Sequence, residues 1–133
     1  MTKKERMLKL LDDTVAHFNS GNRCFSKDRG KCLYVPVNDS SQGCAIGRLL
    51  PAKHKKFITD NDAEDVGVAG LFCSFDTAGL NIPKVFAGLS VGMGLRFLAS
   101  LQDLHDSGEY WCSTGLTESG RQTYKEIKEY FEL

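Results

Sequence analysis

Three stretches of this chain place apolar residues at helical spacing, and this pattern constrains the fold more than any other feature. The stretches span residues 2–18, residues 92–105 and the residues that follow Thr117. In each, apolar residues recur three or four positions apart, which gives an α-helix one apolar face. Thr2 and Glu5 fit a capping box at the start of the first stretch. The sequence therefore predicts a core formed between long amphipathic helices.

The segments between these helices predict short elements. Residues 23–25 and 32–35 favour a small β-hairpin, and residues 44–50 and 52–58 favour two short helices. Residues 60–82 carry several large apolar side chains, and we expect burial there with little regular structure. The expected fold is a mainly helical α+β domain, with two or three longer helices and short helices packed around one small β-hairpin.

Length and composition narrow the class of protein. The 133 residues, 41% of them hydrophobic, are enough for one core, so we expect a single domain over residues 1–133. The 17 Lys and Arg balance the 17 Asp and Glu, which argues against a protein that binds extended nucleic acid. No apolar run reaches the roughly 20 residues of a membrane span. Because no signal-peptide pattern is present either, we expect a cytoplasmic protein whose five cysteines are reduced.

The charge is unevenly distributed along the chain. Residues 1–58 hold 12 Lys and Arg against 5 Asp and Glu, whereas residues 59–133 hold 5 against 12. This division is compatible with a basic patch for a small anion or with a self-complementary interface in a homo-oligomer. The alternative is that the two halves neutralise each other across the fold.

Residues 42–51 are the segment most expected to hold a reactive or binding site. Cys44 lies there between Gly43 and Gly47, and Pro51 follows. Free N–H groups at a helix start lower the pKa of a thiol. A cysteine hydrolase would use Cys44 as nucleophile, His105 as base and Gln42 as oxyanion donor. The spacing does not place them together, and His105 and Asp106, as helix neighbours, would point apart. The alternative is that Cys44 is a small buried residue that only packs in the core.

A zinc site is a second hypothesis, with Cys24, Cys32, Cys44 and His54 as ligands. Zinc-binding domains use cysteine pairs about two to four residues apart. Here 7 and 11 residues separate the successive cysteines. This spacing is more typical of cysteines that flank a hairpin in a core, and we expect no cofactor.

An anion site is the third hypothesis. The N–H groups between Gly43 and Gly47 would contact a phosphate or nucleotide at a helix start. Basic side chains would surround the ligand, namely Arg48, Lys53, Lys55 and Lys56. No phosphate-binding glycine motif is present, and the alternative is a solvated basic helix with these lysines and His54 outward.

Gln102 and His105 share one face of the second long helix, three positions apart. We expect both side chains to be buried and to pair with backbone carbonyls of the segment that contains Cys44, because buried polar groups need partners. This polar lock would be structural rather than catalytic.

Residues 32–34, residues 43–51 and residues 101–106, followed by Trp111, resemble a family of small uncharacterised bacteriophage and prophage proteins. That family pairs a Cys-Ala-Val/Ile-Gly-x-Leu-Ile-Pro segment with a later Leu-Gln-x-x-His-Asp helix. The resemblance covers residues 32–111 and carries no catalytic residues with it. It implies an accessory protein that inhibits or sequesters a host factor by stoichiometric binding, such as a defence component or its nucleotide signal.

The expected partner is therefore a host protein or a small anionic or nucleotide ligand. The ligand would bind the basic segment near Arg48 and Lys53, and a protein would bind an exposed apolar face of the terminal helices. The alternatives from other classes are the small Cys/His hydrolase and a zinc-stabilised interaction module.

Overall fold

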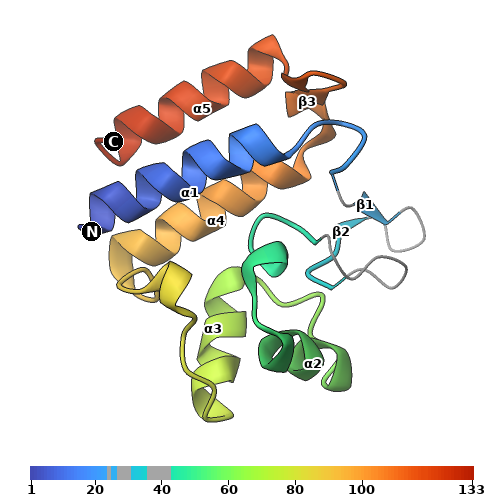
Figure 1. Ribbon diagram of the computed structural model, residues 1–133, viewed down its shortest axis with the longest axis vertical. Coiled ribbons are helices and arrows are strands. Elements are labelled where there is room, and N and C mark those ends of the chain that lie inside the picture. The colour runs from blue at the N-terminus through green and yellow to red at the C-terminus, as the bar shows by residue number, and fades with distance from the viewer. Residues whose placement is uncertain (24, 27–30, 36–42) are drawn as a thin grey trace.

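The computed structural model describes residues 1–23, 25–26, 31–35 and 43–133, with the backbone alone at residues 25–26 and 31–32. The described part is mainly helical with two small hairpins, which confirms the expected α+β class (Figure 1). Its α-helices are α1 (Lys3–His17), α2 (Ala52–Asp60), α3 (Val68–Thr77), α4 (Gly92–Asp106) and α5 (Glu118–Tyr130). Its short 3₁₀-helices are η1 (Gly47–Leu49), η2 (Lys84–Phe86) and η3 (Gly108–Tyr110).

The two hairpins are antiparallel and each has two-residue strands. β1 (Phe25–Ser26) pairs with β2 (Lys31–Cys32), with Phe25 opposite Cys32. β3 (Trp111–Cys112) pairs with β4 (Gly115–Leu116), with Trp111 opposite Leu116. The first hairpin was expected, although its strands are shorter than predicted. The second was not expected, because four strand residues around a tight turn are too few for a visible alternation.

Capping residues set the starts of α1 and α5. The Thr2 hydroxyl accepts the Glu5 N–H over 3.1 Å, and the Glu5 carboxylate accepts the Thr2 N–H over 3.3 Å. The predicted capping box is thus confirmed. At α5, the Thr117 hydroxyl accepts the Gly120 N–H over 3.1 Å.

The three long helices α1, α4 and α5 lie side by side, and α4 contacts both of the others (Figure 1). On its other side α4 packs against α3, and α2 lies beside α3 through the Phe57 and Phe75 rings. Buried apolar side chains from all five α-helices form one continuous core cluster. The helices therefore hold the intervening segments, including the one that contains Cys44, against a common core.

The expectation of little regular structure over residues 60–82 is wrong, because residues 68–77 form α3. The buried residues of α3 are Val68, Leu71, Phe72 and Phe75, and their spacing is helical. Glycines within and around the segment weaken its helix propensity, and burial of this apolar face in the core outweighs that weakness. No helix in the described part of the chain is long and apolar enough to cross a membrane.

Candidate functional site

Residues 43–50, called here the Cys44 segment, pack tightly against the backbone at Tyr34. Gly43 has a φ of 143°, a conformation that favours glycine. Gly47 lies so close to Tyr34 that a Cβ atom there would be 2.5 Å from the Tyr34 Cα. The two glycines therefore allow the close approach of these two backbones.

Three of the N–H groups that were expected to contact an anion are bonded within the protein. The Cys44 N–H donates to the Leu33 carbonyl over 2.9 Å, and the Ile46 N–H donates to Gln102 Oε1 over 3.3 Å. The Gly47 N–H donates to the Cys44 sulfur over 3.3 Å. All three donors belong to buried residues. They are thus not available to an anion in this conformation.

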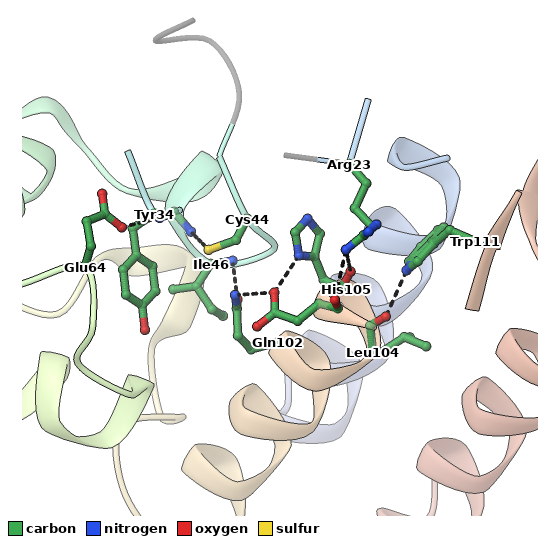
Figure 2. Close-up of polar contacts among 11 residues, drawn as sticks. Arg23, Tyr34, Cys44, Ile46, Glu64, Gln102, Leu104, His105 and Trp111 are labelled. Atoms are coloured by element: carbon green, nitrogen blue, oxygen red, sulfur yellow. Dashed lines mark hydrogen bonds and ion pairs between the residues drawn. The ribbon is translucent and has the colours of Figure 1, made fainter. Parts of the chain in front are cut away.

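The Cys44 thiol is fully buried. Burial raises its pKa to about 12, although hydrogen bonds from Gly47 and Ile46 act in the opposite direction. The thiol is therefore protonated at neutral pH, whereas the thiolate is the nucleophilic form. Figure 2 shows the sulfur turned away from the imidazole of His105.

The ring of His105 is also fully buried, with its edge packed against Phe18 at a centroid distance of 4.5 Å. Nδ1 lies 2.9 Å from the Asp106 carboxylate, and buried Nε2 has no hydrogen-bond partner in the part of the chain that the structure describes. The expectation that His105 and Asp106 point apart is wrong. Asp106 is the last residue of α4, and its carboxylate contacts the ring.

Gln102 joins the Cys44 segment to the end of α4 (Figure 2). Its Oε1 accepts the Ile46 N–H, and its Nε2 donates to the Asp106 carboxylate over 3.0 Å. The contact with the Cys44 segment thus uses a backbone N–H where a carbonyl was expected. His105 bonds to Asp106 instead of to that segment. Gln102 therefore makes the direct link, and His105 contributes through the shared carboxylate.

Two other side chains hold the carbonyls at the end of α4, where a helix leaves such groups without helical partners. Arg23 donates to the Asp106 carbonyl over 2.9 Å and to the His105 carbonyl over 3.4 Å. Trp111 donates from Nε1 to the Leu104 carbonyl over 2.9 Å (Figure 2). The role of Arg23 was not predicted, because 83 positions separate it from Asp106 and no local pattern connects them.

A Cys/His hydrolase is not supported by this geometry. The sulfur of Cys44 and the ring of His105 bond to different groups, and neither residue is exposed to solvent. Gln42, the expected oxyanion donor, lies outside the described residues. We therefore interpret Cys44 as a packing residue and His105 as part of a structural network.

The expected zinc ligands do not meet in the described part of the chain. His54 was expected to point outward, yet it is buried, with Nε2 2.7 Å from the Asn81 carbonyl and its ring on Phe75. Cys24 lies outside the described residues, as does the side chain of Cys32. Among the described residues, no group of three His, Cys, Asp or Glu side chains is placed to hold a metal ion.

The basic residues of the expected anion site are three lysines on α2 and Arg48 on η1, and the two groups lie in different surroundings. Lys53 and Lys56 are exposed on α2 and Lys55 is half-buried, while Lys56 pairs with Asp60. None of these lysines lines the cavity beside Arg48. These lysines therefore fit a helix with a solvated basic face better than a site where basic side chains surround one anion.

Arg48 differs from these lysines because its half-buried side chain extends from η1 beside α1 and lines a cavity there. The guanidinium carbon lies 5.6 Å from the centroid of the Phe18 ring, a cation–π arrangement. Its buried Nε has no hydrogen-bond partner within residues 1–23, 33–35 and 43–133, whose side chains the structure describes. Burial lowers the pKa of Arg48, and Asp13 opposes that shift. The guanidinium remains charged, and several of its donors have no protein acceptor in the described part.

This guanidinium borders a cavity of about 340 Å³, called here the Arg48 pocket. The pocket is walled by one face of α1, by η1 and by η2. Its lining residues are Leu10, Asp13, Ala16, His17, Arg48, Leu49 and Val85. His17 received no role from the sequence, although its position four residues after Asp13 places both on one helix face.

We compared the chain with protein-family models, curated proteins and solved structures, and none of them matches. Function is therefore inferred from the chemistry of the described side chains. At the Arg48 pocket a half-buried cation, whose buried Nε has no acceptor among the described residues, borders a cavity.

The buried imidazole of His105 makes the stability of the fold depend on pH. Burial lowers the pKa of His105 below the ordinary 6.5, as do Arg23 and Arg48, whereas Asp106 raises it. Below about pH 6.5 the unfolded chain therefore takes up a proton more readily than the folded protein. We expect the free energy of unfolding to fall as the pH decreases from 6.5 through the folded-state pKa.

Urea denaturation at pH 7.5, 6.5, 5.5 and 5.0 measures this dependence. His105→Gln should lose stability less steeply toward acid than the wild type, whereas His17→Gln, at an exposed ring, should keep the wild-type slope. An NMR titration of the wild-type imidazoles checks the same point directly. If His105 takes up its proton at or above pH 6.5, the expectation is wrong.

Proposed function

We propose that this chain is a non-enzymatic accessory protein of the phage type, which binds a small phosphate-bearing ligand stoichiometrically in the Arg48 pocket. The observation that carries the proposal is the half-buried guanidinium of Arg48, whose buried Nε has no partner among the described residues and which borders a cavity of about 340 Å³. A buried donor without an acceptor costs roughly 1–3 kcal/mol. Nε itself is covered by protein, so a ligand oxygen in the cavity would bond the terminal N–H groups of the same guanidinium.

The chemistry of the pocket favours an anion with an apolar body. A guanidinium binds phosphate or carboxylate oxygens in a bidentate manner, and it does so more strongly where water is excluded. His17 lies on the same wall and offers a ring N–H. Asp13 also lines the pocket, but its carboxylate is engaged by Lys9 over 2.8 Å. Leu10, Leu49 and Val85 provide apolar walls for the remainder of the ligand.

The size of the pocket supports a nucleotide as the ligand. A volume of about 340 Å³ lies at the lower end of the roughly 300–1,000 Å³ typical of small-molecule sites. It suits one nucleotide unit, with its phosphate at Arg48 and its base or ribose on the apolar walls. Capture of a host defence nucleotide would then deplete the signal without turnover, which matches the role that the resemblance implies.

Binding is tested by isothermal titration and thermal shift with cyclic and linear nucleotides and with inorganic phosphate. A ligand at 100 times its Kd should stabilise the protein by about 2.7 kcal/mol. We expect at least one nucleotide to bind with 1:1 stoichiometry. Arg48→Met should weaken its binding at least about tenfold, because a hydrogen bond to a charged group contributes roughly 1.5–3 kcal/mol. Arg48→Lys should bind with intermediate affinity.

The matched control is Lys53→Met, which removes a cation from the exposed face of α2 outside the pocket. It should bind as the wild type does. Two results would contradict the proposal. One is that no nucleotide binds to the wild type, and the other is that Arg48→Met, shown to be folded by its melting curve, binds with unchanged affinity.

A further inference from the structure

The large apolar side chains that remain exposed gather at one end of the long helices. In the described part of the chain they are Met1, Val91, Met93 and Tyr130, which are 71%, 71%, 47% and 61% exposed. The first turns of α1 and α4 and the last turn of α5 meet at this end (Figure 1). The Lys4–Glu132 ion pair and the contact between the Phe97 and Phe131 rings confirm that meeting.

A groove of about 430 Å³ runs between α4 and α5 from this end. Its lining includes the small side chains of Ala99, Ser100 and Thr123, together with Tyr130 near the end of α5. Small residues allow the backbone of another helix to approach closely. Met93 precedes Ser100 by seven positions and therefore lies on the same face of α4. The exposed apolar residues thus continue into the groove.

The charges on the two walls indicate what fits the groove. Arg96 lies on the α4 wall and Glu126 on the α5 wall. Both are exposed, and no ion pair joins them. A two-fold axis on the groove would bring Arg96 of one copy opposite Glu126 of the other, and the reverse pair would form at the same time. The groove is therefore complementary in charge to itself.

We propose that the α4–α5 groove binds a second copy of this chain and forms a two-fold symmetric homodimer. Tyr130 and Met93 supply apolar contacts at one end of the groove, as aromatic residues and methionine commonly do at interfaces. The two Arg96–Glu126 pairs set the register, because such pairs contribute more to specificity than to affinity. The Arg48 pocket shares no residues with the α4–α5 groove.

Sedimentation velocity on the full chain from 1 to 200 µM tests the proposal. The wild type should shift from the 14.7 kDa monomer to twice that mass within this range. Arg96→Glu alone and Glu126→Arg alone should each raise the dimer dissociation constant at least tenfold, since each places like charges across the axis. An equimolar mixture of these two variants should form a heterodimer, because both cross-copy pairs are then complementary again.

The matched control is Lys125→Glu, a charge reversal at an exposed position of α5 that does not line the groove. It should dimerise as the wild type does. A wild type that stays monomeric at 200 µM overturns the proposal. So does a dimer that persists in both single variants, or a mixture that remains monomeric. Tyr130→Ala should raise the dimer dissociation constant without a change in register. An unchanged dissociation constant would also contradict the proposed homodimer.

Discussion

Gly47→Ala is expected to lower the free energy of unfolding by more than about 3 kcal/mol, or to prevent stable folding. The added Cβ atom would meet the carbonyl oxygen of Tyr34 and would lie 2.5 Å from its Cα. These atoms belong to the backbone and cannot turn away as a flexible side chain can. The Cys44 segment would have to separate from Tyr34, which would also weaken its bond to Gln102.

Gly67→Ala is the matched control, because an added Cβ atom there meets nothing within 4 Å and the backbone φ of −66° is allowed for alanine. Urea denaturation followed by far-UV circular dichroism measures both variants. Gly67→Ala should stay within about 1 kcal/mol of the wild type, since it occupies a helix N-cap. A Gly47→Ala protein as stable as the wild type would show that the two backbones are not in close contact.

Glu64→Ala should destabilise the protein by about 2–4 kcal/mol. One oxygen of the Glu64 carboxylate accepts the Tyr34 N–H over 2.6 Å, and the other accepts the Val35 N–H over 3.0 Å. Both bonds are partly buried and join residues about 30 positions apart in the sequence. Their loss would leave two N–H groups without partners beside Gly47, which packs on the same backbone.

Glu64→Gln keeps one carbonyl oxygen as an acceptor but not the charge, so its loss of stability should be about half that of the alanine variant. Glu129→Ala, at an exposed position of α5, should change stability by less than about 0.5 kcal/mol. The same urea denaturation compares all three. If Glu64→Ala and Glu129→Ala are equally stable, the Glu64 bonds contribute nothing in solution.

The helices were predictable wherever local sequence and tertiary packing agree. The capping box at Thr2 and the apolar faces of α1 and α4 are short-range patterns, and the structure confirms them. The same rules missed α3, in which glycines lower local helix propensity and burial in the core compensates. His54 was placed outward from its basic neighbours, yet a bond to the Asn81 carbonyl holds it inside.

The candidate site was predictable in its residue types but not in its geometry. Arg48 was identified as a potential ligand for anions, together with backbone N–H groups and lysines that the structure places elsewhere or bonds internally. The walls of its pocket come from α1 and η2, and no local pattern connects those elements with η1. His17 and Asp13 therefore entered the site only when the helices were packed.

The sequence by itself determined the class of fold, because amphipathic periodicity and capping act between residues a few positions apart. It also indicated that Gln102 and His105 belong to a polar contact near Cys44. Only the tertiary structure decided the protonation and the hydrogen-bond partners of Cys44, His105 and Arg48. Burial holds the thiol of Cys44 protonated, and the Asp106 carboxylate bonds to the ring of His105. Arg48 Nε has no acceptor among the described residues. Solvation and partners at long sequence separation set these properties, and a linear pattern does not encode them locally.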